Sequence, residues 1–126
     1  MAERPALLSP ADPAPVTVLR EGGRSPFLLI ADHAGQAVPS ALGRLGLPQP
    51  ELDRHIGWDI GIAGTTARLA DLLDACAIMQ NYSRLVIDCN RPLESPGSIA
   101  ERSDGTEVPG NLGLDAAQRR QRVEEI

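Results

Sequence analysis

Residues 27–35 read FLLIADHAG, an apolar run that stops at an aspartate, a histidine and a glycine. The four apolar residues from Phe27 to Ile30 predict a buried parallel strand whose carboxyl end opens into a loop. α/β proteins place their chemistry at such strand ends. Because the chain has only two histidines, His33 is the clearest single candidate for a functional residue. The alternative is a histidine that only satisfies a hydrogen bond in the loop.

The composition indicates a soluble protein with no affinity for nucleic acids or membranes. The chain has 126 residues, which is enough for one domain but short for an α/β hydrolytic enzyme. Its net charge is -5 and its arginines form no basic stripe, so we expect no nucleic-acid partner. No apolar run is long enough for a membrane span, and the two cysteines form no CxxC pair. We therefore expect a cytoplasmic protein, and the abundance of Ala, Arg, Gly and Pro without lysine suggests a bacterial source.

Strands and helices are predicted from the hydrophobic pattern. Residues 1–14 are rich in proline and have no periodicity, so we expect a flexible arm there and a single domain over residues 15–126. Strands are predicted at 16–19, 27–30, 76–80 and 85–87, with a hairpin turn at 21–24 between the first two. Helical segments are predicted at 38–47, 50–55, 60–73 and 116–126, the last capped by Asp115. A long loop covers 90–113, and the whole order predicts a mixed, mainly parallel sheet with helices packed on it.

Two histidine and aspartate groups could bind a metal ion. They are Asp32-His33 and the segment HIGWD, which runs from His55 to Asp59. Imidazole and carboxylate are ligands of zinc and similar metals. For Asp59 the alternative is the N-cap of the helix that follows, a role that does not exclude metal binding through its other oxygen. For His55 a surface or packing position is favoured.

A third group, in the segment SRLVIDCNRP, could bind the substrate. Arg84, Asn90 and Arg91 flank a predicted strand that ends at Asp88. An arginine at the mouth of a sheet can hold a substrate carboxylate with two hydrogen bonds. The alternative is a structural salt bridge from Arg91 to Asp88 or Glu94. A nucleophilic role is not favoured for Ser83, Cys76 or Cys89, because Ser83 has no adjacent base and the cysteines lie in or beside apolar strands.

Four motifs together resemble the N-formylglutamate amidohydrolase family. They are DHAG with Val38-Pro39 behind it, LDRHIGWDIG, SRLVIDCNRP and SDGTEVPGN, and they occur in the family's order. The resemblance implies a metal-dependent hydrolase related to zinc carboxypeptidases and aspartoacylase-like deacylases, with a three-layer αβα fold of the zinc-exopeptidase type. The implied reaction is hydrolysis of N-formyl-L-glutamate, or a similar N-acyl amino acid, to formate and glutamate. It also implies that residues 15–126 are the N-terminal part of a domain that is incomplete at its C-terminus.

The resemblance also implies roles for individual residues. His33 matches the first ligand of a divalent metal, for which zinc is expected. Gln36 stands where the wider carboxypeptidase-like group has a glutamate ligand, so Asp59 is the more attractive second ligand. Asn90 and Arg91 resemble the pair that holds the acidic end of the substrate, and Arg84 is expected to assist them in binding and catalysis. Two other expectations remain: a truncated, non-catalytic module that binds carboxylates, or a remnant of such an enzyme. The oligomeric state is not predicted.

Overall fold

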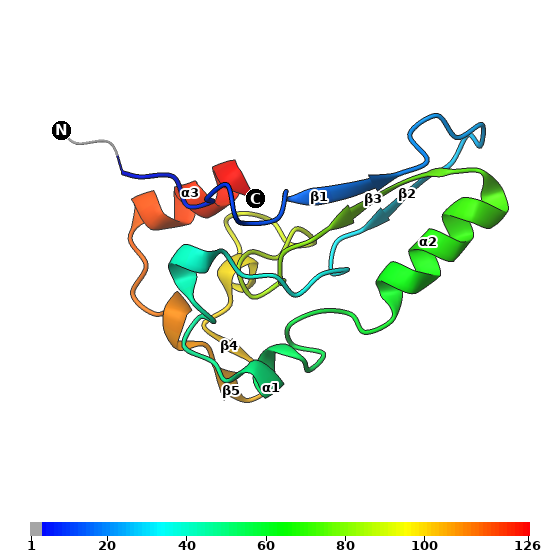
Figure 1. Cartoon of the computed structure of the whole chain (residues 1–126). Helices are drawn as coiled ribbons and strands as arrows, with labels where there is room; N and C mark the ends of the chain where they lie inside the picture. Colours follow the sequence, from blue (N-terminus) through cyan, green and yellow to red (C-terminus); the bar gives the residue numbers. More distant parts are fainter. Residues whose placement is uncertain (1–3) are drawn as a thin grey trace.

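The computed structural model describes residues 4–126 and contains a small mixed β-sheet, which lies with helix α2 (Ile62–Leu73) at one side of the molecule (Figure 1). The strands are β1 (Val16–Leu19), β2 (Leu28–Ala31) and β3 (Cys76–Gln80), in the order β1-β3-β2. β1 pairs with β3 antiparallel and β2 pairs with β3 parallel. The mixed sheet with helices confirms the α/β class. The sheet is not mainly parallel, because it has one pair of each kind.

The helix α2 (Ile62–Leu73) connects β2 to β3 and packs against both strands. This is the crossover that a parallel pair requires. The helix buries Thr66 and Ala70, and the sheet face it covers carries small or half-buried side chains such as Leu29 and Ala77. Among the described residues, helical cover is seen on this face alone, and the predicted three-layer arrangement stays a prediction.

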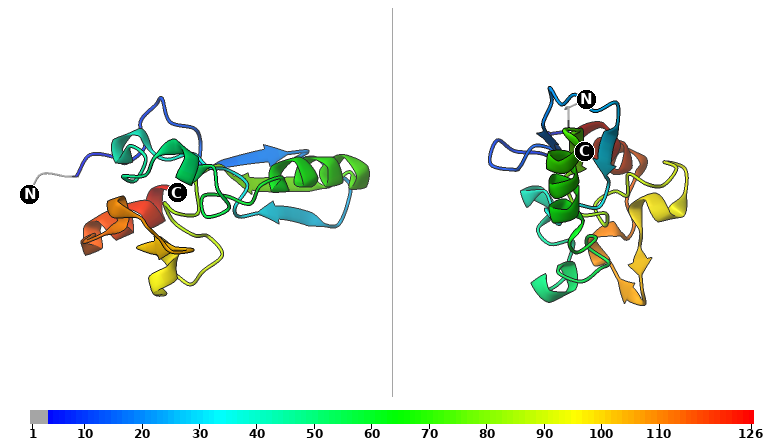
Figure 2. Two further views of the ribbon diagram at one scale, coloured as in Figure 1. Left: turned by 90° about the horizontal axis from the view of Figure 1, so that it is seen from below. Right: turned by 90° about the vertical axis from the view of Figure 1, so that its right-hand side faces the viewer.

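The other elements lie beside the sheet, so that the strands and α2 project from the rest of the molecule (Figure 2). They are η1 (Ser40–Leu42), α1 (Gln49–Leu52), η2 (Pro96–Ile99), β4 (Arg102–Ser103), β5 (Thr106–Glu107), η3 (Pro109–Asn111) and α3 (Ala116–Glu125). A core of apolar side chains holds this part together: Leu45, Leu47, Leu52, Ile56, Leu85, Val86 and Val108.

The predicted hairpin between the first two strands is wrong. β3 lies between β1 and β2, so these two strands do not pair. The turn after β1 is instead held by the end of α2, where Arg20 pairs with Asp74 at 2.5 Å and the Ser25 N–H donates to the Asp74 carbonyl at 2.9 Å. The glycines at 22 and 23 thus mark a turn, but the turn leads to a different edge of the sheet.

The strand predicted at 85–87 is also wrong. The chain turns there, and the Val86 N–H donates to the Ser83 carbonyl at 2.9 Å. Leu85, Val86 and Ile87 are buried in the core, and a short apolar run of this length fits a strand or a buried turn equally well.

Three further expectations need correction. The strand at Phe27 to Ile30 is parallel but not buried, since Leu28 is 57% and Ile30 70% exposed. Helix α1 ends at Leu52, short of the predicted residue 55. Helix α2 begins at Ile62 after Gly61, whose φ of 88° is left-handed, so Asp59 is not its N-cap.

The N-terminal segment from Arg4 onward contacts α3, the last helix of the chain. Asp115 caps this helix as predicted, through a capping box with Gln118. The segment expected to be an arm, of which residues 1–3 lie outside the described part, makes tertiary contacts from Arg4 onward. The Leu7 N–H donates to the Glu125 carboxylate at 2.8 Å, and the Pro13 carbonyl accepts from the Tyr82 hydroxyl at 2.6 Å.

Candidate active site at the end of β2

The loop that carries His33 is held against the segment that follows β3. The Ala37 N–H donates to the Asn81 carbonyl at 3.1 Å, and the Ser83 N–H donates to the Ala37 carbonyl at 2.8 Å. Gly35 makes this close approach possible, because a Cβ there would collide with the Asn81 backbone. The two strands therefore continue as a pair of tethered loops.

A third segment joins these loops through backbone contacts. The Asp59 N–H donates to the His33 carbonyl at 2.8 Å, and the Ser83 hydroxyl donates to the Gly57 carbonyl at 2.7 Å. Ser83 is fully buried and its hydroxyl is used in this way, which agrees with the expectation that it is not a nucleophile. Segments from three distant parts of the sequence thus meet beside His33.

The imidazole of His33 lies between two carboxylates. Its Nε2 is 2.6 Å from Asp88 Oδ1, and its Nδ1 is 3.3 Å from Asp59 Oδ2. The side chains of His33 and Asp88 are 9% and 4% exposed, whereas that of Asp59 is 50% exposed. One ring nitrogen is therefore held in the interior, and the other faces a carboxylate open to solvent.

Arginines surround the buried carboxylate of Asp88. Arg84 reaches its Oδ2 at 3.2 Å and also Asp59 Oδ1 at 3.4 Å, and Arg91 Nε lies 3.6 Å from Asp88 Oδ2. Burial raises the pKa of Asp88, but hydrogen bonds from His33 and the Asn90 N–H, with the charges of His33 and Arg84, outweigh it and hold this pKa below its ordinary value. Asp88 is therefore an anion at neutral pH, and the salt bridge to Arg91 weighed from the sequence is present.

A groove of about 200 Å³ opens beside this cluster. Its lining includes three arginines, Arg84, Arg91 and Arg102, and one acidic side chain, that of Asp88. The positive charges exceed the negative one, which suits an anionic ligand. Arg102 comes from β4 and was not singled out in the sequence.

Asn90 and Gln36 have other surroundings. Asn90 gives its backbone N–H to Asp88 at 3.0 Å, and it lines a different groove together with Asp32. Gln36, oriented so that both its amide atoms are satisfied, donates to the Leu52 carbonyl and to Asp53 at 3.1 Å each. These hydrogen bonds tie the His33 loop to the end of α1, so Gln36 has a structural role.

Comparison with known proteins decides the family. The sequence profile described as N-formylglutamate amidohydrolase matches residues 25–126. The chain belongs to the N-formylglutamate amidohydrolase family. This confirms the resemblance carried by the four sequence motifs.

A solved structure resembles this family member closely. It is the crystal structure of gene product Atu2144 from Agrobacterium tumefaciens, with 36% sequence identity and a TM-score of 0.90. The match covers 95% of this chain and 48% of the Agrobacterium chain, so the present chain spans about half the length of that relative. A search of curated proteins found no match.

The remaining candidates, His55 and the two cysteines, make no contact with the His33 side chain in the part of the chain that the structure describes. His55 is on the surface and contacts Asp104 at 3.1 Å with a side chain 66% exposed, as its surface alternative predicts. Cys76 is half-buried and Cys89 exposed, and both are free thiols. No helix within residues 4–126 is long and apolar enough to cross a membrane.

The side chains near His33 fit a divalent metal in part. Two donors about 2.1 Å from one tetrahedral ion lie about 3.4 Å apart, and His33 Nδ1 and Asp59 Oδ2 are 3.3 Å apart. The contact of 2.6 Å between His33 Nε2 and Asp88 is instead a hydrogen bond, of the kind that orients a metal-bound histidine. Residues 4–126 contain no group of three or more His, Cys, Asp and Glu side chains that could hold an ion.

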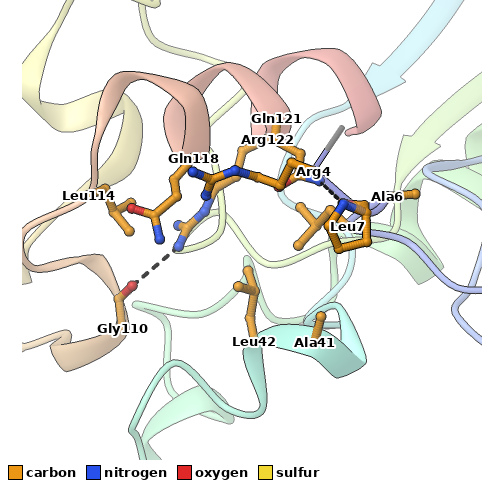
Figure 3. A pocket seen from close by; sticks show the side chains of 11 residues that line it. Arg4, Ala6, Leu7, Ala41, Leu42, Gly110, Leu114, Gln118, Gln121 and Arg122 are labelled. Atoms are coloured by element: carbon orange, nitrogen blue, oxygen red, sulfur yellow. Dashed lines mark hydrogen bonds between the residues drawn. The ribbon is translucent and has the colours of Figure 1, made fainter. Parts of the chain in front are cut away.

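A second hollow, of about 300 Å³, lies between α3 and η1 (Figure 3). The side chain of Arg122 lies at its base and is 2% exposed overall. It donates to the carbonyls of Val86 at 2.9 Å and Gly110 at 3.2 Å and to Asn111 Oδ1 at 2.6 Å. Burial, with the nearby charge of Arg119, lowers the pKa of Arg122 to about 10. All its acceptors are neutral oxygens, and its hydrogen bonds tie α3 to the segments around Val86 and Gly110. Arg122 therefore has a structural role.

Proposed function

We propose that this chain contributes one half of a metal-dependent amidohydrolase that hydrolyses N-formyl-L-glutamate or a similar N-acyl amino acid. The carrying observation is the pair of contacts on His33: Asp88 at one ring nitrogen and the half-exposed Asp59 at the other. His33 Nδ1 and Asp59 Oδ2 are therefore separated by the distance expected between two ligands of one metal ion. Family membership supports the reaction class.

His33 and Asp59 would hold the ion, for which zinc is the best match to one imidazole and one carboxylate. When bound, such an ion polarises an acyl carbonyl and lowers the pKa of a bound water. Asp88 would keep the proton of His33 on Nε2, so that Nδ1 would present its lone pair to the ion. Arg84 donates to both carboxylates and fixes their positions relative to the ring.

The groove beside the cluster would take the acidic end of the substrate. N-formylglutamate carries two carboxylates, and a guanidinium binds a carboxylate through two parallel hydrogen bonds. Arg91 has a side chain 52% exposed and only a long contact to Asp88, so it can turn toward a ligand. Arg84 and Arg102 line the same groove, and Asn90 at the neighbouring groove would assist through its amide.

Formate release from N-formyl-L-glutamate, measured with zinc added to the protein, tests the proposal. His33→Ala should lower kcat/KM at least about 100-fold, because losing a ligand costs more than the 10–100-fold typical of losing the group that orients it. His55→Ala is the matched control, since this histidine lies on the surface, and it should change kcat/KM less than about twofold. Equal turnover in the wild type and His33→Ala would refute the assignment.

A carboxylate-binding module without catalysis is the second candidate. It is favoured by one observation: three arginines line the groove within residues 4–126, whereas these residues contain no group of three or more His, Cys, Asp and Glu side chains that could hold an ion. Calorimetry with N-formyl-L-glutamate separates the two functions. Binding that is the same with and without zinc, and no formate release, would favour the module.

A further inference from the structure

The hollow between α3 and η1 holds a buried positive charge without a carboxylate partner among residues 4–126 (Figure 3). Arg122 is 2% exposed, and its acceptors are the Val86 and Gly110 carbonyls and the amide oxygen of Asn111, all of them neutral. Arginine is seldom buried this deeply without an anion beside it, because removing its charge from water costs free energy. The hydrogen bonds of Arg122 tie segments together, but they leave its charge unbalanced.

Part of the Arg122 guanidinium is still available as a donor. A guanidinium has five N–H groups, and the three hydrogen bonds of Arg122 use Nη1 twice and Nη2 once. The Nε N–H and one N–H of Nη2 therefore have no acceptor in the described part of the chain. These two donors belong to neighbouring nitrogens of one planar group, and a carboxylate can accept from both with its two oxygens.

The walls of the hollow suit the aliphatic chain of a small ligand. The volume of about 300 Å³ is at the lower end of the range for small-molecule sites, which are mostly apolar with a few polar groups. Leu7, Leu42 and Leu114 supply apolar surface, and Gln118 and Gln121 supply amides. Among the described residues, no acidic side chain lines the hollow, so nothing there repels an anion at close range.

We propose that this hollow is a second anion site, in which the Arg122 guanidinium binds the carboxylate of a short aliphatic acid and the leucine walls hold its chain. Arg4 lines the hollow as well, but it pairs with Asp115 at 3.3 Å, so Arg122 supplies the charge that lacks a counter-ion.

The hollow is separate from the candidate active site. It shares no lining residue with the groove of Arg84, Arg91 and Arg102. That groove is lined mainly by polar and charged side chains, whereas the hollow has apolar walls and one unbalanced guanidinium. The second anion site therefore does not depend on the proposed function, and it favours a ligand with an aliphatic chain over inorganic phosphate.

Calorimetry with sodium hexanoate, on the protein freed of metal ions by a chelator, tests the second anion site. We expect one hexanoate per chain and an affinity at least about tenfold lower for hexanamide, which has the same length but no charge, because hydrogen bonds between charged partners are the stronger ones. Absence of hexanoate binding overturns the proposal. Equal affinity for hexanamide, or binding of inorganic phosphate but not hexanoate, overturns it as well.

Gln118→Glu places a negative charge in the hollow without disturbing the helix, because glutamate at this position also completes the capping box with Asp115. It should weaken hexanoate binding about tenfold or more. Ala116→Glu is the matched control: it adds the same charge at an exposed position of α3 outside the hollow, and affinity should change less than about twofold. Equal losses in the two variants would overturn the proposal.

Two further variants locate the bound hexanoate. Arg122→Met should abolish binding, with circular dichroism to show that the variant folds, and Gln118→Glu carries the test if it does not. Arg91→Met removes a charge from the other groove and should leave the affinity for hexanoate unchanged. Binding that is lost in Arg91→Met and kept in Gln118→Glu would place hexanoate in that groove and overturn the second anion site.

Discussion

Asp88 Oδ1 lies 2.6 Å from His33 Nε2, on the opposite side of the imidazole ring from Asp59. The buried carboxylate holds the ring in one orientation, and in the proposed metal site it would keep the proton on Nε2. The side of the ring that faces the half-exposed Asp59 is left for a ligand. This relationship joins two loops that are 55 residues apart in the sequence.

Replacing Asp88 by asparagine tests its orienting role. Asp88→Asn keeps the shape of the side chain but removes the anion, so zinc affinity should fall about 10–100-fold, as for other groups that orient a metal-bound histidine. Calorimetric titration with zinc measures the change. Asp104→Asn is the control, since Asp104 contacts the surface residue His55, and a similar loss in both variants would count against the role of Asp88.

Two glycines give opposite predictions for the same substitution. Gly35→Ala should destabilise the protein by about 1–3 kcal/mol, because the new Cβ would meet the Asn81 backbone. Gly64→Ala should stabilise it by about 0.4–1 kcal/mol, because Gly64 lies inside α2 and a Cβ there meets nothing within 4 Å. Urea unfolding measures both changes, and a destabilised Gly64→Ala variant would contradict the packing of α2.

Arg122 should matter for stability although it lies on a polar helix. Arg122→Met removes the donor for two carbonyls and the Asn111 side chain, so we expect a loss of about 2–4 kcal/mol in the free energy of unfolding. Arg120→Met, at an exposed position of the same helix, should change it by less than about 0.5 kcal/mol. Equal unfolding midpoints for the two variants would show that the contacts of Arg122 are not needed.

The contact between Glu125 and the N-terminal segment should depend on pH. Hydrogen bonds from the backbone of Leu8 and Leu7 lower the pKa of Glu125 from 4.5. Because the folded pKa is the lower one, this stabilisation is present above about pH 4.5 and is lost as the pH falls through the folded pKa. Melting temperatures should therefore differ between the wild type and Glu125→Gln at pH 6 and converge toward pH 3. Glu124→Gln, at an exposed position, should follow the wild type, and parallel curves for all three proteins would refute the contact.

The sequence predicted the elements whose signals are local. Alternation and apolar runs located β1 and β3, and the cap residue Asp115 located α3. The glycine and histidine after β2 located the candidate site, and the structure brings His33, Asp59, Arg84 and Arg91 together around Asp88. Pairing of strands is not local, which is why the order β1-β3-β2 could not be predicted.

Residues without a local signal were missed. Nothing in the sequence distinguishes Arg122, which is buried, from the exposed Arg120 on the same helix. Arg102 stands in a segment without periodicity, and only the fold places it beside Arg84 and Arg91. Asp88 was noted as a possible salt-bridge partner of Arg91. Its contact with His33 could not be predicted, because the two residues are 55 positions apart and only the fold brings them together.

Zinc binding to residues 1–126, measured by calorimetry, tests the metal site most directly. We expect one zinc ion per chain, with an affinity that falls at least about tenfold in both His33→Ala and Asp59→Asn and stays the same in His55→Ala. Unchanged zinc affinity in His33→Ala and Asp59→Asn would contradict the claim that these two side chains begin the metal site.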